Sequence, residues 1–168
     1  MKKTIVIVMM YTAALSVMAQ EWQGEYAWVD TPEEKATIEK TVEEGAQQVG
    51  RAIRFVARKR LTESTKPFMK LTFAVKDNVV TMTRDDDTPI ASVADGSTLE
   101  WKRKDGAKFA VTQTLEGNTL TQTFTDSEKN TRINKHIFAE DGQSLELQIT
   151  INSSSLKIPL NYTITYHK

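Results

Sequence analysis

One lysine and two tyrosines are the polar side chains best placed to hold a small ligand. Lys135 shares a face of its segment with Ile133 and Ile137, and Tyr162 and Tyr166 lie on the apolar face of the last segment. A cation on an apolar face needs a partner, because burying an unpaired charge is costly. An ammonium group and phenolic hydroxyls together suit a carboxylate or hydroxyl head group. The alternative is that Lys135 extends past the rim of the fold and both tyrosines belong to the core.

A second polar pair lies on otherwise apolar faces of neighbouring segments. Gln113 alternates with threonines in one segment, and Gln122 does so in the next. These amides either hydrogen-bond a ligand or internal water, or they bond each other. Large side chains on the same inner faces are the candidate walls of a ligand cavity: Phe73, Trp101, Phe109 and Phe124. Trp101 equally suits the core.

A basic cluster lies toward the end of the expected helical region. Its members are Arg51, Arg54, Arg58, Lys59 and Arg60, with Phe55 off the main apolar stripe. In one interpretation, Arg51, Arg54, Phe55 and Arg58 form a portal that attracts anionic ligands and transiently contacts an anionic membrane surface. In the other, the cluster is a solvated face favoured by the negative end of the helix dipole.

Residues for catalysis or metal binding are scarce. His136 and His167 lie on expected outer faces, and the chain has no cysteine, no nucleophile elbow and no phosphate-binding loop. The acidic residues 85–87 lack the spacing of a calcium loop. We therefore expect a non-enzymatic protein with no catalytic residue, metal or cofactor. The 22 basic and 22 acidic residues balance, which argues against nucleic acid as a partner.

Short alternating segments separated by turn signals must position these side chains. Asp77-Asn78, Asp95-Gly96, Asp105-Gly106 and Asp141-Gly142 are such turns, and residues 21–29 make a first strand. Hairpin-linked strands bury one face by curling the sheet until it closes. A parallel α/β fold is excluded because no crossover helices follow the later strands. We predict a mainly β fold, a ten-stranded antiparallel up-and-down β-barrel.

One helical region, the expected lid, separates the first and second strands. Thr31 is a suitable N-cap, Pro32 suits the first helical position, and Glu34 is placed to complete a capping box. The apolar stripe comprises Ile38, Val42, Ala46, Val49, Ile53 and Val56. Gly45 and Gly50 each weaken a helix by about 1 kcal/mol relative to alanine. They predict either a bend or two shorter helices, ending near Thr62.

The first nineteen residues resemble a secretory signal peptide. Lys2 and Lys3 precede an apolar stretch over residues 5–15, and Val17 and Ala19 occupy the small-residue positions before a cleavage site. The stretch is too short to span a bilayer. We therefore expect a periplasmic or secreted protein, monomeric, with residues 20–168 as its single domain. Without cysteine it forms no disulfide.

The order of elements resembles that of the fatty-acid-binding proteins, within the lipocalin or calycin group. Four segments carry the resemblance: Trp22-Gln23-Gly24, Lys66-Pro67, residues 116–122 and residues 163–168. They are similar to the family's opening strand, the start of its second strand, its seventh hairpin and its closing Thr-Arg-x-Tyr-x-Lys. The likeness covers most of residues 20–168.

The resemblance implies a fatty-acid carboxylate held by two arginines and a tyrosine on the eighth and tenth strands. The tyrosine corresponds to Tyr166 and one arginine to Lys135, but the other position is Ile164, so that cation is missing. Export and a longer helical insert also depart from the family's pattern. These departures leave the specificity for fatty acids undecided. They do not change the expectation that the barrel encloses a small ligand.

We therefore predict an exported carrier or binding protein for a small hydrophobic or amphipathic, fatty-acid-like ligand inside the barrel. The alternative is a non-enzymatic protein-interaction or inhibitor module on a filled barrel. A third interpretation is an open, half-curled sheet that cups lipid tails. A cavity of about 300 Å³ or more lined by Phe73, Trp101, Phe109, Phe124 and Ile149 would favour the carrier, and a solid core the interaction module.

Overall fold

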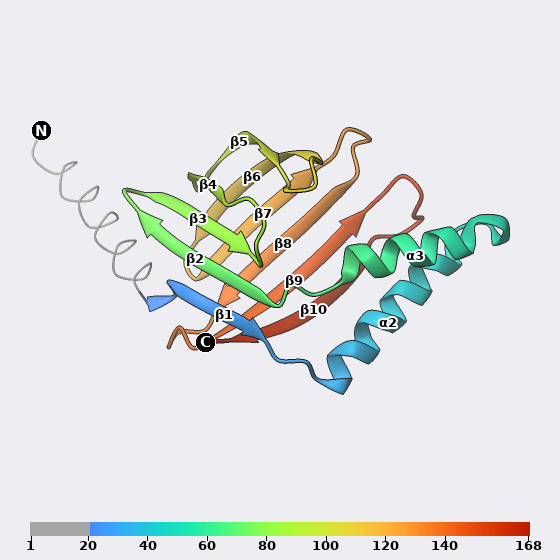
Figure 1. Cartoon of the computed structure of the whole chain (residues 1–168), viewed down its shortest axis with the longest axis horizontal. Coiled ribbons are helices and arrows are strands. Elements are labelled where there is room, and N and C mark those ends of the chain that lie inside the picture. Colours follow the sequence, from blue (N-terminus) through green and yellow to red (C-terminus); the bar gives the residue numbers. More distant parts are fainter. Residues whose placement is uncertain (1–20) are drawn as a thin grey trace, which may run out of the picture.

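The computed structural model describes residues 21–168, so the expected signal segment 1–19 lies outside the described residues. Ten antiparallel strands form one sheet that curls into a nearly closed barrel, as predicted (Figure 1). The strands are β1 (Gly24–Trp28), β2 (Lys70–Lys76), β3 (Val79–Arg84), β4 (Ile90–Val93), β5 (Asp95–Lys102), β6 (Lys108–Glu116), β7 (Thr119–Thr125), β8 (Thr131–Phe138), β9 (Ser144–Asn152) and β10 (Leu160–His167). Their order in the sheet is β4-β3-β2-β1-β10-β9-β8-β7-β6-β5.

Backbone hydrogen bonding is weakest at two places around the barrel, between β1 and β10 and between β4 and β5. β1 pairs with β10 through only Ala27 with His167 and Trp28 with Tyr166. β4 and β5 share no ladder, and β5 shifts register against β6 between Asp95 and Thr98. The gap is bridged from β6, where Gln113 Nε2 donates to Ser92 Oγ at 2.7 Å and Leu115 N donates to Ala94 O at 3.2 Å. The ring is thus closed partly by side chains.

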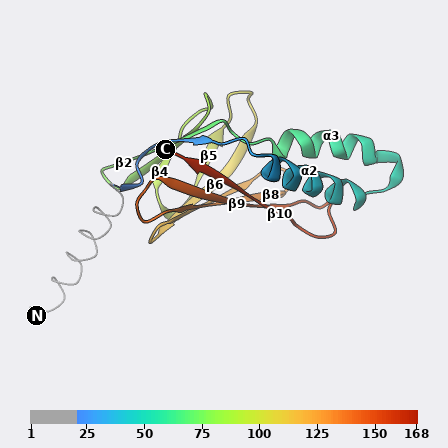
Figure 2. The same cartoon turned by 90° about the horizontal axis from the view of Figure 1, so that it is seen from below.

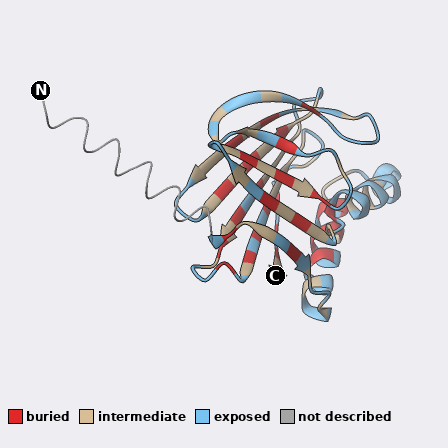
Figure 3. Ribbon diagram, turned by 60° about the vertical axis from the view of Figure 1, so that its left-hand side comes forward, coloured by how far each residue is buried: buried red, intermediate tan, exposed pale blue. Residues whose placement is uncertain are grey.

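Alternation of burial along the strands follows the predicted pattern, with one exception (Figure 3). In β7, Leu120, Gln122 and Phe124 are buried between threonines. In β8 the predicted facing is wrong, because Asn134 and His136 are buried and Lys135 is exposed. The reason is register: Leu120 lies opposite His136, and residues directly opposite in a ladder share a face of the sheet.

The helical region is a hairpin of two helices. α2 (Pro32–Gln47) and α3 (Arg54–Thr65) are joined through a short 3₁₀ turn, η1 (Arg51–Ile53), which settles the choice between a bend and two helices. The chain reverses after Gly50, so Ile38 and Val42 are buried whereas Ile53 is exposed. The hairpin projects to one side of the barrel, with η1 at its far tip (Figures 1 and 2). Within residues 21–168, no helix has the length and hydropathy of a membrane span.

Glu34 ties the start of α2 to the sheet. Thr31 caps the helix as predicted, its Oγ1 accepting from Glu34 N at 3.3 Å. The Glu34 carboxylate bonds two groups of the sheet: it accepts from Trp28 Nε1 and from Thr165 N, both at 2.7 Å. Thr165 lies on β10 just where the short β1 stops pairing with it. The acid therefore satisfies a backbone donor that the sheet leaves free.

Close packing of α2 depends on the absence of a side chain at Gly45. A Cβ there would lie 2.7 Å from Leu61 Cδ1 and 2.8 Å from Leu160 Cδ1, too close for carbon atoms. We expect Gly45→Ala to destabilise the fold by about 1–2 kcal/mol, although alanine ordinarily favours a helix over glycine. Urea unfolding measures the change.

Gly50→Ala is the matched control, since a Cβ at Gly50 would meet nothing within 4 Å. Its expected effect is below about 0.5 kcal/mol. Equal losses in the two variants would contradict the tight contact between α2, α3 and β10.

Aromatic side chains fill the end of the barrel away from Arg132 on β8. The Trp22 and Phe138 rings stack with centroids 4.5 Å apart, and Phe73 meets Phe138 edge-on at 5.0 Å. Tyr26 completes the group, its hydroxyl lying 2.9 Å from Trp22 O and 3.0 Å from Gly142 O, so its one hydrogen is shared between two carbonyl acceptors. Burial raises the pKa of Tyr26 to about 12. This half of the barrel is a packed core.

Candidate ligand-binding site

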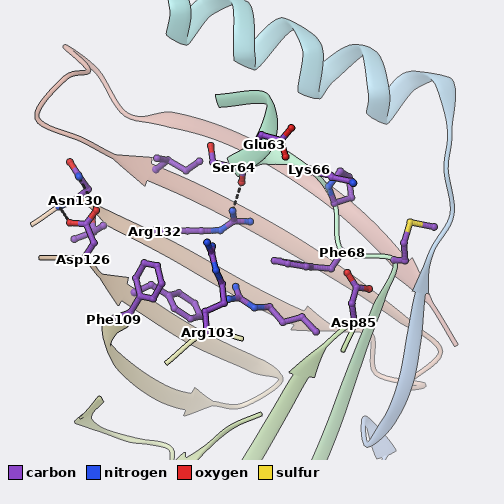
Figure 4. A pocket seen from close by; sticks show the side chains of 16 residues that line it. Glu63, Ser64, Lys66, Phe68, Asp85, Arg103, Phe109, Asp126, Asn130 and Arg132 are labelled. Carbon is purple, nitrogen blue, oxygen red and sulfur yellow. Dashed lines mark hydrogen bonds between the residues drawn. The ribbon is translucent and has the colours of Figure 1, made fainter. Parts of the chain in front are cut away.

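A pocket of about 450 Å³ opens at the end of the barrel beside the C-terminus of α3. It is lined by the segment that leads from α3 to β2, by the turns after β3, β5 and β7, and by the start of β8 (Figure 4). Its apolar walls are Pro67, Phe68, Met69, Phe109, Phe124 and Ile151, and its basic side chains are Lys66, Arg84, Arg103 and Arg132. A volume of several hundred cubic ångströms is typical of small-molecule sites.

Arg84, the last residue of β3, is the most buried cation of the pocket, only 5% exposed. Its guanidinium lies 4.7 Å from the ring centroids of both Phe68 and Trp101 and 5.1 Å from that of Phe124. Its acidic partner, Asp87, is 3.5 Å away, and its Nε has no partner among residues 21–168. Burial, aided by the charge of Arg132, lowers the pKa of Arg84 to about 10. The group remains a cation with an unused donor.

Arg132, at the start of β8, connects the pocket to the lid. Its Nη1 donates to Ser64 O at 2.6 Å, at the last turn of α3 (Figure 4), and its Nε donates to Asn134 Oδ1 at 2.9 Å. A cation is favoured at this end of a helix because the free carbonyls there carry partial negative charge. Arg132 thus holds α3 at the mouth of the pocket.

Tyr162 and Tyr166 project from β10 into the barrel. Both are buried, and neither hydroxyl has a hydrogen-bond partner within the described part of the chain. Burial raises the pKa of each phenol, and the nearby charge of Arg132 acts in the opposite direction. Neither tyrosine is among the residues that line the pocket, whereas Arg132 is. A role of Tyr162 and Tyr166 in binding therefore stays a prediction.

Lys135 lies exposed on the outer face of β8, so its predicted place inside the barrel is wrong. Gln113 and Gln122 bond each other: Gln122 Nε2 donates to Gln113 Oε1 at 2.6 Å. Gln122 Oε1 is left without a partner among residues 21–168. The structure thus supports the interpretation in which the two amides pair.

The four predicted aromatic wall residues lie in three different places. Phe109 and Phe124 line the pocket. Trp101 lies under the guanidinium of Arg84, and its Nε1 donates to Thr88 O at 3.0 Å. Phe73 is in the packed core, between Tyr26, Trp22 and Phe138. The pocket of about 450 Å³ thus has Phe109 and Phe124 in its lining but not Phe73, Trp101 or Ile149, so it lies at the mouth of the barrel and not at its centre.

The predicted portal residues lie on the hairpin and outside the lining of the pocket. Arg51 and Phe55 are exposed near the tip of the hairpin, and Phe55 is 76% exposed. Arg54 is the first residue of α3, and Arg58 pairs with Glu43 of α2, its Nε donating at 2.9 Å. Contact of this tip with an anionic membrane surface stays a prediction.

The prediction that His136 lies on an outer face is wrong. It is fully buried on the inner face of β8, its Nδ1 is 3.2 Å from Leu120 O, and its Nε2 has no partner among the described residues. Burial lowers the pKa of His136 to about 4, and the charges of Arg132 and Arg84 act in the same direction. His167 is exposed, as expected. In the described part of the chain, no three His, Cys, Asp or Glu side chains gather as metal ligands.

No protein-family model and no curated protein matches the chain. Among solved structures, it is similar to fatty-acid-binding protein 1 of Echinococcus granulosus, with 15% identity and a TM-score of 0.55 over 89% of this chain and 98% of that one. A Schistosoma mansoni fatty acid binding protein in complex with arachidonic acid matches at 15% identity and a TM-score of 0.54 over 90% and 98% of the two chains. A luciferase domain from the dinoflagellate Lingulodinium polyedrum matches at 13% identity and a TM-score of 0.52, over 87% of this chain and 41% of that one.

These likenesses confirm the predicted fold, a ten-stranded antiparallel barrel with helices between the first two strands, which is also the fold of the fatty-acid-binding proteins. At such identities they concern the fold alone, and one fold hosts several functions. The luciferase domain is an example, because a barrel of this shape also occurs in an enzyme. The function of this chain therefore depends on the chemistry of its own pocket.

Proposed function

We propose that this chain binds a small anionic amphiphile, of the fatty-acid type, at the mouth of its barrel and carries it unchanged. The observation that supports the proposal most is Arg84, a buried cation with an unused donor in an apolar pocket. A buried guanidinium costs free energy unless it is paired. A carboxylate would supply both the opposite charge and two acceptor oxygens in the geometry that arginine favours.

The surroundings of Arg84 suit the rest of such a ligand. Arg132 adds a second cation to the lining of the pocket. The buried hydroxyls of Tyr162 and Tyr166 lie close to Arg132 but outside that lining, so they would act on the head group through Arg132. Phe68 and Phe109 supply apolar wall for a hydrocarbon group. We place the head group at the arginines and the hydrocarbon against the aromatic rings.

We further propose that the carrier works outside the cytoplasm, in the periplasm or as a secreted monomer. The support is the signal-like composition of residues 1–19. The first nineteen residues lie outside those that the structure describes, so this part depends on sequence alone.

A second candidate is the protein-interaction or inhibitor module. One observation favours it: the interior beyond the pocket is packed with buried side chains, including Phe73, Leu120 and Leu147. In that case the loops or the helical hairpin would contact a protein partner, and the pocket would take no amphiphile.

Binding of three ten-carbon ligands separates the candidates. By isothermal titration, we expect decanoate to bind at least about tenfold more tightly than decanol, because a hydrogen bond to a charged group contributes roughly 1.5–3 kcal/mol. Decylamine, with the same charge as the arginines, should bind least. Equal affinity for decanoate and decylamine would contradict an anion site, and no binding of any of the three would favour the interaction module.

A further inference from the structure

The pocket ends at Arg84. The guanidinium lies against Trp101 and Phe124, so it occupies the passage between the mouth and the barrel interior. The side chains behind it are closely packed and at most 2% exposed: Phe73, Val80, Met82, Val111, Gln113, Leu120, Gln122, His136, Leu147 and Ile149. A hydrocarbon chain therefore has no room beyond the arginine.

The other end of the pocket leads to solvent. Met69 is 58% exposed, and Phe109 and Ile151 are only half-buried. The last turn of α3, held by the bond from Arg132 to Ser64 O at 2.6 Å, limits the mouth on the opposite side. A ligand with its head group at Arg84 must point its chain outward, and a long chain would leave the protein.

We infer that the pocket selects short and medium anionic amphiphiles, with roughly a dozen carbons or fewer, and gains nothing from longer chains. If each non-hydrogen group takes roughly the 30 Å³ that a water molecule occupies in the liquid, the 450 Å³ pocket holds about fifteen groups. The carboxylate uses three of these, and the hydrocarbon takes the rest. This inference rests on the proposed function and specifies its ligand class.

A series of straight-chain carboxylates tests the limit. Affinity is measured by isothermal titration from hexanoate to octadecanoate, each below its micelle concentration. Each buried methylene should tighten binding by about fourfold, and methylenes in solvent should change it by less than about twofold. We expect a steep rise that ends near dodecanoate. A rise at the same slope to octadecanoate would overturn the inference, whereas failure of every carboxylate to bind would overturn the proposed function.

A substitution in the pocket lining tests where the hydrocarbon chain of the ligand lies. Ile151→Trp fills part of the pocket and should move the break in the series to shorter chains by about two carbons. Ile133→Trp is the control, because Ile133 lies on the outer face of β8, beside Lys135. A break that stays in place in Ile151→Trp, or that moves equally in both variants, would overturn the inference.

Discussion

An Arg84→Met protein should bind decanoate about 30- to 100-fold more weakly than the wild type, and yet unfold at no lower temperature. The loss of affinity follows because the most buried cation of the pocket disappears, with the donors it offers to a carboxylate. Stability is kept because the guanidinium is poorly paired, with Asp87 at 3.5 Å and its Nε without a partner among the described residues. Methionine fills a similar volume, and Asp87 keeps the backbone donors Thr88 N and Lys104 N, each at 2.8 Å.

Arg103→Met is the matched control for charge. Arg103 also lines the pocket, but it is exposed and pairs with Asp105 of the same turn. We expect it to weaken decanoate binding by less than about fivefold, as for an exposed ion pair. Decanol affinity should change little in either variant. Equal losses for decanoate and decanol in Arg84→Met would mean that Arg84 shapes the pocket and does not recognise the anion.

Acid should destabilise the protein through His136, by roughly 3 kcal/mol between pH 6.5 and pH 4. In the folded state burial holds the pKa of His136 at about 4, below the ordinary value of 6.5. The unfolded chain therefore takes up a proton first as the pH falls, so the contribution of His136 is complete above pH 6.5. It is lost progressively toward pH 4 and falls no further below that pH.

Urea unfolding of the wild type and His136→Leu at several pH values isolates this effect. Leucine cannot titrate, so the wild type should lose more stability than the variant between pH 6.5 and pH 4. His167→Leu is the control, since His167 is exposed and its replacement should leave the pH dependence of the wild type unchanged. Parallel curves for wild type and His136→Leu would show that His136 is not buried in its neutral form.

Turn residues and alternation were enough to predict the barrel, because each hairpin is encoded locally. Positive φ angles at Asn78, Gly106 and Gly142 occur at predicted turns, whereas Gly96 lies inside β5 at its register shift, so the turn predicted at Asp95-Gly96 is wrong. The facing of β8 is the exception, since Ile133 and Ile137 point outward while Asn134 and His136 point inward. Hydrophobic periodicity assigns the apolar side to the core, and only pairing with β7 reverses that assignment. A strand with polar inward residues cannot be placed from its own sequence.

The site was predictable in part. Tyr162 and Tyr166 follow from the strict alternation of β10. Arg84 carries a signal in the sequence, because it continues the inward series of Val80 and Met82, but the acidic turn directly after it favours an exposed position. The inward position of Arg132 follows only from the facing of β8, which its own sequence does not reveal. The pocket forms where three segments come together: the end of β3, the start of β8 and the C-terminus of α3. They meet only because the sheet curls, and no local sequence pattern predicts that.

The gap between β4 and β5 bears on how copies of this protein behave at high concentration. A sheet that does not close completely has two edge strands, and an exposed edge strand can pair with a strand of a second molecule and start a fibre. Here the edge strand β4 is four residues long, and the edge strand β5 is interrupted by a register shift near Asp95. Such short or irregular edge strands are poor templates for pairing with another molecule. The barrel can therefore keep its incomplete seam without becoming a seed for aggregates.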